Sequence, residues 1–181
     1  MAKQVRDVYG NALFEVALEE NRVDGYLSEA QGIITAIDEN PDLIQMMTHP
    51  QISEEEKASV LESIFRGRVS EEIYALLDMI LRKGHFSDVK DVFSDFVDRV
   101  KEYRRIGVVY VSTPMELPAA QRSALEDKLL ETTDYVTLEP HYDVDPALIG
   151  GMVIRIGDRV VDSSVRSKLD SLTHELMSIR L

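Results

Sequence analysis

Hydrophobic residues recur every three or four positions through the first hundred residues of the chain. Apolar side chains at this spacing fall on one face of an α-helix, so the pattern predicts a series of amphipathic helices. Short loops between them favour a compact six-helix bundle. We expect the helices within residues 5–17, 23–37, 41–47, 53–65, 70–81 and 87–104.

Local signals mark several ends of these helices. Ser53 and Glu56 have the spacing of a capping box, in which the side chain of each accepts a hydrogen bond from the backbone of the other. Asn40 precedes a proline, a residue that suits the first position of a helix. Ser70 is placed to cap the fifth helix. Gly84 is placed to end that helix in the left-handed backbone conformation.

The periodicity changes after Gly107. Residues 108–113 and 135–142 are rich in β-branched and aromatic residues and read as strands, with an amphipathic helix at 118–132 between them. Pro140 within the second of these segments predicts an edge strand or a strand end, because proline cannot donate to a β-ladder.

The last part of the chain combines a hairpin with a helix. A strand at 152–156 is followed by a turn at 157–158 and a returning strand. Ser163 or Ser164 can then cap a final helix. This arrangement leaves no room for a catalytic loop and favours a structural role. The apolar positions of the final helix are Val165, Leu169, Leu172 and Leu176.

Together these patterns predict an α+β fold with two domains. Residues 1–105 form the six-helix bundle. Residues 106–181 follow the order βαβββα, which implies a small α/β sandwich with helices packed on the sheet.

The chain has 33 acidic and 20 basic residues, a formal net charge of −13. Binding to nucleic acid or to anionic lipid requires clustered Lys and Arg, which the sequence lacks. The acidity either keeps the surface well solvated or attracts a basic partner segment. The chain has neither a signal or transit peptide nor an apolar run near the roughly 20 residues that span a bilayer. We therefore expect a soluble intracellular protein.

Candidate chemistry is sparse. The chain has no cysteine, and its four histidines lie far apart in the sequence. Gly150, Gly151 and Gly157 stand at the two ends of one predicted strand, whereas a phosphate-binding loop connects a strand to a helix. These glycines indicate turns and close packing. We predict no catalytic residue, no metal site and no cofactor.

The first and fifth predicted helices have more apolar residues than one narrow stripe requires. One interpretation is that each helix is buried on several sides. The other is that the two helices form a groove for an amphipathic helix of a partner. Core and groove use the same residue types, so both interpretations stay open.

Three parts of the chain carry a family resemblance. They are the segment Val8-Tyr-Gly-Asn-Ala-Leu-Phe-Glu-Val-Ala17, the segment 80–86 with 92–96, and the run from Gly150 to Leu172 that contains Ile-Arg-Ile-Gly-Asp. Together they resemble the delta subunit family of F-type ATP synthases, called OSCP in mitochondria. Two departures are Lys83-Gly84-His85 in place of Asn-Gly-Arg, and Ser163 in place of the usual glycine.

The resemblance implies a non-catalytic stator subunit. Such a subunit joins the α3β3 head of the synthase to the peripheral stalk, so that proton-driven rotation is coupled to ATP synthesis. The N-terminal domain would receive N-terminal helices of the α subunits, with the β subunit nearby. The C-terminal domain would meet the b or b/b′ stalk subunits. The implied location is peripheral, on the cytoplasmic face of the bacterial cell membrane, without direct membrane insertion.

The resemblance also indicates the contact residues. The candidates for an α-subunit groove on the first and fifth helices are Tyr9, Ala12, Leu13, Val16, Leu76, Met79 and Ile80. The candidates for stalk binding on the last helix are Val165, Leu169 and Leu172. Two alternatives are a helical adaptor unrelated to ATP synthase, and a small-molecule enzyme that uses the C-terminal domain. A large polar pocket in that domain would favour the enzyme.

Overall fold

The computed structural model describes the backbone of residues 2–178, and the side chains of that range apart from those of 2–5, 176 and 178. The chain divides into two units, Met1–Lys101 and Glu102–Leu181. The division falls within a helix, slightly before the boundary at 105 that the sequence indicates. The first unit is helical and the second holds a sheet, so the predicted α+β class is confirmed.

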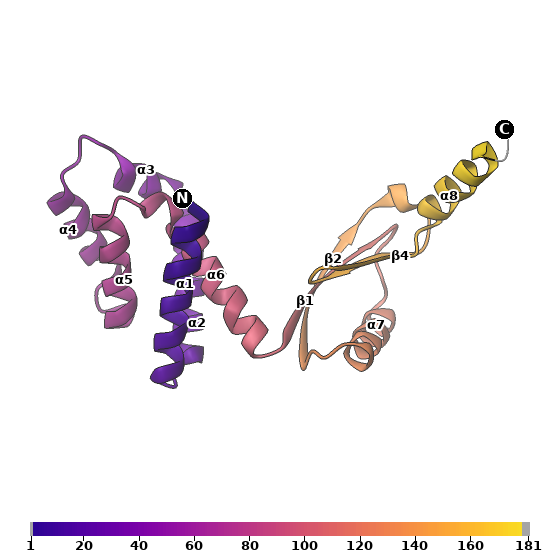
Figure 1. Ribbon diagram of the computed structural model, residues 1–181, viewed down its shortest axis with the longest axis horizontal. Helices are drawn as coiled ribbons and strands as arrows, with labels where there is room; N and C mark the ends of the chain where they lie inside the picture. Colours follow the sequence, from indigo (N-terminus) through magenta and orange to yellow (C-terminus); the bar gives the residue numbers. More distant parts are fainter. Residues whose placement is uncertain (1, 179–181) are drawn as a thin grey trace. The chain divides into compact units, whose positions relative to one another are not determined.

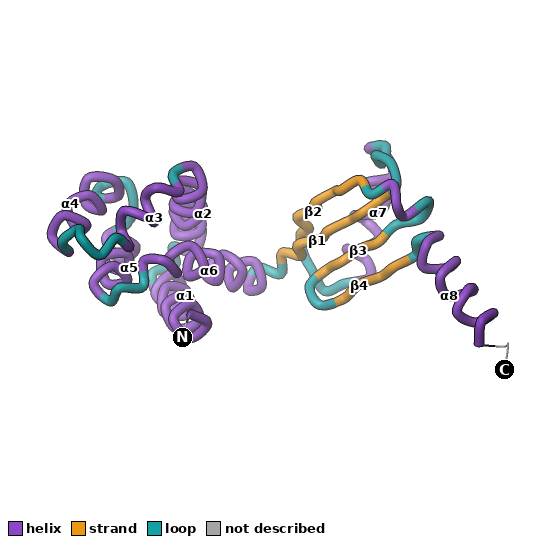
Figure 2. The backbone as a smooth tube through the Cα atoms, turned by 90° about the horizontal axis from the view of Figure 1, so that it is seen from above, coloured by secondary structure: helices purple, strands orange, loops and turns teal. Residues whose placement is uncertain are grey.

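The first unit is a group of helices joined by short loops (Figures 1 and 2). The sixth α-helix of this unit begins at Val89, two residues later than the sequence predicts, because a turn of 3₁₀ helix, η1, precedes it. The elements are α1 (Ala2–Glu19), α2 (Val23–Glu39), α3 (Pro41–Thr48), α4 (Glu54–Phe65), α5 (Glu71–Arg82), η1 (Phe86–Asp88) and α6 (Val89–Tyr103).

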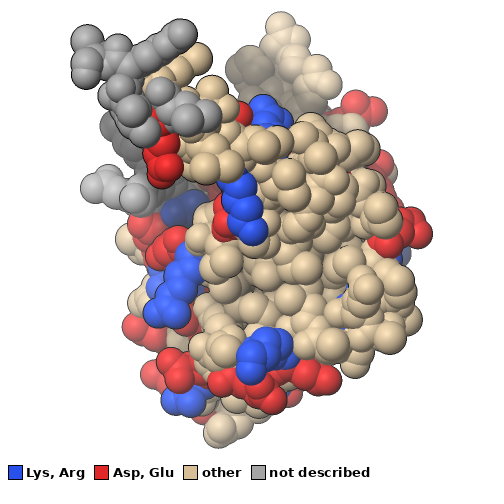
Figure 3. All heavy atoms as spheres, turned by 90° about the vertical axis from the view of Figure 1, so that its right-hand side faces the viewer, with Lys and Arg blue, Asp and Glu red and all other residues tan. Residues whose placement is uncertain are grey.

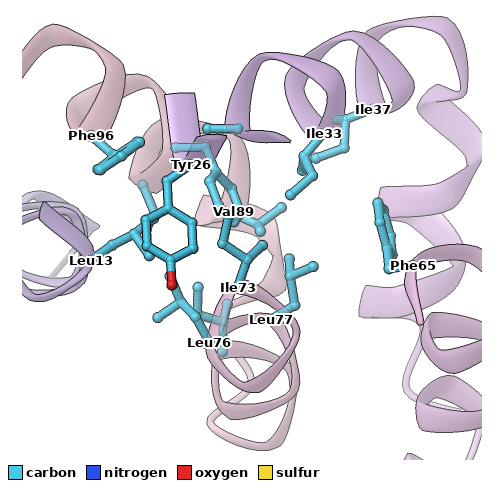
Figure 4. Packing of buried hydrophobic residues seen from close by; sticks show 14 of the residues in the cluster. Leu13, Tyr26, Ile33, Ile37, Phe65, Ile73, Leu76, Leu77, Val89 and Phe96 are labelled. Atoms are coloured by element: carbon cyan, nitrogen blue, oxygen red, sulfur yellow. The ribbon is translucent and has the colours of Figure 1, made fainter. Parts of the chain in front are cut away.

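Buried side chains from these helices form one hydrophobic core (Figure 4). Tyr26 of α2 is fully buried in it, among residues that include Leu13 and Ile73. The Tyr26 hydroxyl donates a hydrogen bond of 2.6 Å to Oε2 of Glu20. Burial and this carboxylate raise the pKa of Tyr26 well above its ordinary value, which keeps the phenol neutral.

The predicted start of α4 and the predicted end of α5 are confirmed. Ser53 and Glu56 form the capping box. Gly84 has a φ of 72°, and the nitrogens of Gly84 and His85 donate to the carbonyls of Leu81 and Ile80. These two bonds complete a Schellman motif at the end of α5.

Two predicted caps differ from the structure. Ser70 precedes α5, but its side chain makes no capping bond. Its backbone nitrogen and Oγ instead donate to Oε2 of Glu29, at 2.6 and 2.8 Å. The side chain of Asn40 likewise leaves the start of α3 uncapped and donates to the carbonyl of Ala36 at the end of α2.

The second unit contains a four-stranded sheet in the order β2-β1-β3-β4 (Figure 2). The β1–β2 pair is parallel, and the β1–β3 and β3–β4 pairs are antiparallel. Pro140 lies in β2 at one edge of the sheet, as predicted. The strands are β1 (Ile106–Thr113), β2 (Thr137–Val144), β3 (Val153–Ile156) and β4 (Arg159–Asp162).

Helix α7 (Ala119–Thr132) connects the two parallel strands and covers one face of the sheet. Val109, Val111 and Ile156 are buried on that face, against Leu125 and Leu129 of α7. The short 3₁₀ helix η2 (Pro146–Leu148) follows β2.

The last helix, α8 (Val165–Ser178), follows β4 and contacts η2. The expectation that both helices pack on the sheet is wrong for α8. Among its described side chains none is buried, and Figure 2 shows the helix leading away from the strands.

Candidate partner-binding surfaces

The candidate residues on α1 and α5 divide into buried and exposed groups. Ile80 has no exposed surface, and Leu13 and Leu76 are 4% and 8% exposed. These three side chains belong to the core. Ile80 and its neighbour Met79, which is 48% exposed, therefore have opposite surroundings although they are adjacent in sequence.

The remaining candidates on α1 are accessible from outside. Ala12 is exposed, and Tyr9 and Val16 are half-buried against the core. Val8 is 63% exposed and was missed by the sequence reasoning. Its position one turn before Ala12 is the signal that could have identified it, because residues four apart share a helix face. Helix α1 contacts α5, so these side chains and Met79 are presented by neighbouring helices.

The three candidates on α8 form an exposed apolar stripe. Val165, Leu169 and Leu172 are 38%, 50% and 54% exposed and follow one another at spacings of four and three residues. Figure 3 views the molecule from the side on which α8 lies in Figure 1. Uncharged atoms fill much of that face, and most acidic side chains lie toward its edges. An exposed stripe of this kind is typical of a helix that binds another protein.

The start of α8 is fixed by a small hydrogen-bond network. Ser164 provides the cap, because its buried Oγ accepts from the backbone nitrogen of Ser167. Asp162 accepts from Oγ of Ser167 at 2.5 Å and from the backbone nitrogen of Ser164 at 2.8 Å. The bond from Ser167, followed by those from Ser164, holds the pKa of the Asp162 carboxyl below its usual range.

The loop before β3 packs against the start of α8. The nitrogen of Val165 donates to the carbonyl of Gly150. Gly151 has a φ of 75°, and a Cβ there would lie 2.3 Å from the carbonyl oxygen of Ser163. Only glycine fits this position without displacing the backbone. The glycines of this run thus serve a turn and close packing, as the sequence indicates.

Ile149 in the same loop has an unusual backbone that the sequence reasoning missed. Its φ and ψ are 67° and −41°, and the nitrogen of Gly150 donates to the carbonyl of Leu148 at 2.7 Å. This is a γ-turn of the strained kind, which a β-branched residue rarely adopts. The Ile149 side chain is 65% exposed. The strain therefore presents an apolar side chain to solvent close to the start of α8.

A pocket of about 630 Å³ lies in the second unit and tests the enzyme alternative. Its lining is mixed, with guanidinium groups, carboxylates and threonine hydroxyls beside Tyr135 and Ile156, and with neither histidine nor serine. The two threonine hydroxyls donate to carbonyls of α7, Thr132 to Lys128 and Thr133 to Leu129. Neither threonine hydroxyl thus donates to a general base, as covalent catalysis by a hydroxyl nucleophile would require.

The described residues were also compared with the requirements of a metal site and of a membrane-spanning helix. They contain no cluster of three or more His, Cys, Asp or Glu side chains able to hold a metal ion. None of the helices in the described range is both long and apolar enough to span a bilayer.

Residues 5–176 match the sequence profile of the ATP synthase delta (OSCP) subunit family. The chain belongs to this family. It is 42% identical over 181 residues to the ATP synthase subunit delta of Lachnoclostridium phytofermentans, and the match covers all of both chains. It is 31% identical to the subunit delta of Brevibacillus brevis, over 97% of this chain and 99% of that one.

Membership in the delta (OSCP) family gives the chain a structural role in the stator of an ATP synthase, and no catalytic role. A chain of the Toxoplasma gondii mitochondrial ATP synthase hexamer shares its fold, with a TM-score of 0.73 and 20% identity. That match covers 93% of this chain and 95% of the other.

Proposed function

We propose that this delta-family chain joins the α3β3 head of an ATP synthase to the b or b/b′ peripheral stalk. In this proposal α1–α6 act as one six-helix bundle that receives N-terminal helices of the α subunits, with the β subunit nearby. The unit formed by the sheet, α7 and α8 faces the stalk. The chain then works as a peripheral subunit on the cytoplasmic face of the bacterial cell membrane.

The exposed stripe on α8 carries the stalk part of the proposal. Val165, Leu169 and Leu172 leave apolar surface in water although the hydrophobic effect favours its burial. A helix of the stalk that covers them would regain that free energy. The network of Asp162, Ser164 and Ser167 fixes the direction in which the stripe leaves the sheet.

The accessible residues of α1 and α5 support the contact with the head. The accessible side chains, which can contact a partner helix, are those of Tyr9, Ala12, Val16 and Met79. The buried side chains, which pack α1 and α5 into the core, are those of Leu13, Leu76 and Ile80. Tyrosine and methionine, as at Tyr9 and Met79, are favoured residue types at the centre of protein interfaces.

The test of the stalk contact uses the full chain and a peptide from the C-terminal end of the b subunit. Leu169→Asp and Leu172→Asp place a charge in the stripe and should each weaken binding by about 2 kcal/mol or more in calorimetry. His174→Asp is the matched control, because residue 174 lies on the opposite face of α8 and is exposed. Equal affinity for all three variants and the parent chain would refute the stalk contact.

A further inference from the structure

The apolar stripe of α8 has the spacing of a coiled-coil seam. Val165, Leu169 and Leu172 occupy positions d, a and d of a heptad repeat, and all three are exposed. When two such helices run antiparallel, an a position of one lies opposite a d position of the other. Leu169 then contacts Leu172 of a second copy, and a twofold axis repeats this contact. Two leucine layers thus form the centre of the pair.

The charges on α8 oppose the dipole of the helix itself. Arg166 and Lys168 lie in its first turn, and Glu175 lies in its last turn. An isolated helix is stabilised by the reverse arrangement, with acidic residues at its start and basic residues at its end. The stability of α8 alone therefore does not account for these positions. A second copy in the opposite direction does, because its acidic end lies beside the basic start of the first.

The register set by the leucines brings these opposite charges together. Lys168 and Glu175 both occupy g positions, and the g positions of two antiparallel helices lie along one edge of the contact. Lys168 of each copy is then next to Glu175 of the other, so the pair gains two contacts between exposed, oppositely charged side chains. In a parallel pair Lys168 would instead lie beside Thr173, which has no charge. The antiparallel direction is therefore favoured.

The position of α8 leaves room for a second copy. The helix leads away from the strands in Figure 2, and none of its described side chains is buried. Its 14 residues span about 21 Å. An antiparallel pair holds the two sheets at opposite ends of this length, which exceeds the Debye length of about 10 Å at 0.1 M salt. Salt therefore screens much of the repulsion between these two parts.

We propose that α8 of the free chain pairs with α8 of a second copy, antiparallel and with Leu169 against Leu172. Two helices of about four turns bury less surface than the roughly 1,200 Å² at the lower end of stable interfaces. The dimer is therefore weak, with a dissociation constant on the order of 100 μM. It covers the stripe before assembly, and a stalk helix then has to displace the second copy. This last consequence rests on the proposed stalk contact.

Sedimentation equilibrium of the full chain, from about 10 μM to about 1 mM, measures the pairing. We expect the parent chain to dimerise as its concentration rises. Lys168→Glu and Glu175→Lys each place like charges side by side and should weaken the dimer about tenfold or more. Asp170→Lys is the matched control for Glu175→Lys. It makes the same change of charge at an exposed b position, which points away from the second helix, and should preserve the dimer.

An equal mixture of the Lys168→Glu and Glu175→Lys variants tests the register directly. In the mixed pair each g–g contact again joins a glutamate to a lysine. We therefore expect the mixture to dimerise like the parent chain, although each variant alone is largely monomeric. Recovery in the mixture also shows that both variants are folded.

Three results would overturn the proposal. The first is a parent chain that stays monomeric throughout, the second is a dimer that both charge reversals leave intact, and the third is a monomeric mixture. A peptide from the C-terminal end of the b subunit separates this pairing from the stalk contact. A monomeric parent chain that binds the peptide refutes the pairing alone. A parent dimer that the peptide does not dissociate supports the pairing and counts against stalk binding on this stripe.

Discussion

Glu29 on α2 accepts two hydrogen bonds from Ser70, one from its backbone nitrogen at 2.6 Å and one from its hydroxyl at 2.8 Å. The two residues are 41 positions apart. Glu29 therefore connects the start of α5 to α2, and the Ser70 hydroxyl donates to this carboxylate and makes no cap of α5.

We expect Glu29→Ala to lower the free energy of unfolding by about 1–3 kcal/mol, because a partly buried donor loses its acceptor. Urea denaturation measures this change. Glu39→Ala is the control, since Glu39 is an exposed glutamate at the end of the same helix. Equal destabilisation by the two variants would show that the bonds to Ser70 add nothing.

Truncation of the neighbours Met79 and Ile80 should affect different properties, peptide binding for Met79 and stability for Ile80. Met79→Ala removes exposed surface and should weaken the binding of an α-subunit N-terminal peptide, with stability changed by less than about 0.5 kcal/mol. Ile80→Ala leaves a cavity in the core and should cost about 2–5 kcal/mol of stability. Calorimetry with the peptide and urea denaturation separate the two effects. Unchanged peptide affinity in Met79→Ala, with native circular dichroism, would exclude the groove on α1 and α5.

The network at the start of α8 predicts a dependence on acid pH. The pKa of Asp162 is lower in the folded chain than in the unfolded one, so its contribution is complete above the unfolded value of about 3.9. The contribution is lost as the pH falls through the lower, folded value. The protection factors of the Ser164 and Ser167 amides, which correct for the slower intrinsic exchange in acid, should therefore fall below about pH 4.

Asp162→Asn is the matched variant for this effect. It keeps an oxygen that can accept from Ser164 but has no carboxyl to titrate. The protection factors of these two amides in the variant should show no step in the acid range. The same acid step in both proteins would assign it to another group.

Replacing Ile149 with glycine should increase the stability of the folded chain. Its φ of 67° is strained for a β-branched residue, and glycine adopts this region freely. Ile149→Gly should stabilise the chain by about 1 kcal/mol in urea denaturation. Val160→Gly, which truncates an equally exposed β-branched residue in a regular strand, should destabilise it. A loss of stability in both variants would mean that the turn carries no strain.

The sequence predicted those features that depend on neighbouring residues. The capping box of Ser53 and Glu56 and the end of α5 at Gly84 involve residues a few positions apart, so their spacing is visible in the chain. Pro140 indicated an edge strand or a strand end because proline has no backbone N–H to donate, and β2 does lie at one edge of the sheet. The family, too, could be recognised from runs of contiguous residues.

Other features depend on contacts that the sequence does not display. Ser70 is a residue type that often caps helices. Its backbone nitrogen and hydroxyl nevertheless donate to the carboxylate of Glu29, which is 41 residues away. Met79 and Ile80 are both apolar, and only the packing of α5 shows which one faces water. The strain at Ile149 was equally hidden, because the glycines that follow it are the residues expected to adopt positive φ.

The two edge strands of the sheet, β2 and β4, affect how readily the free subunit aggregates before it is assembled. An edge strand can recruit a strand from another molecule and so begin aggregation. Here β2 offers one donor fewer because of Pro140, and β4 places Arg159 and Asp162 on either side of its two valines. Newly made copies are thereby discouraged from pairing edge to edge while they await their partners.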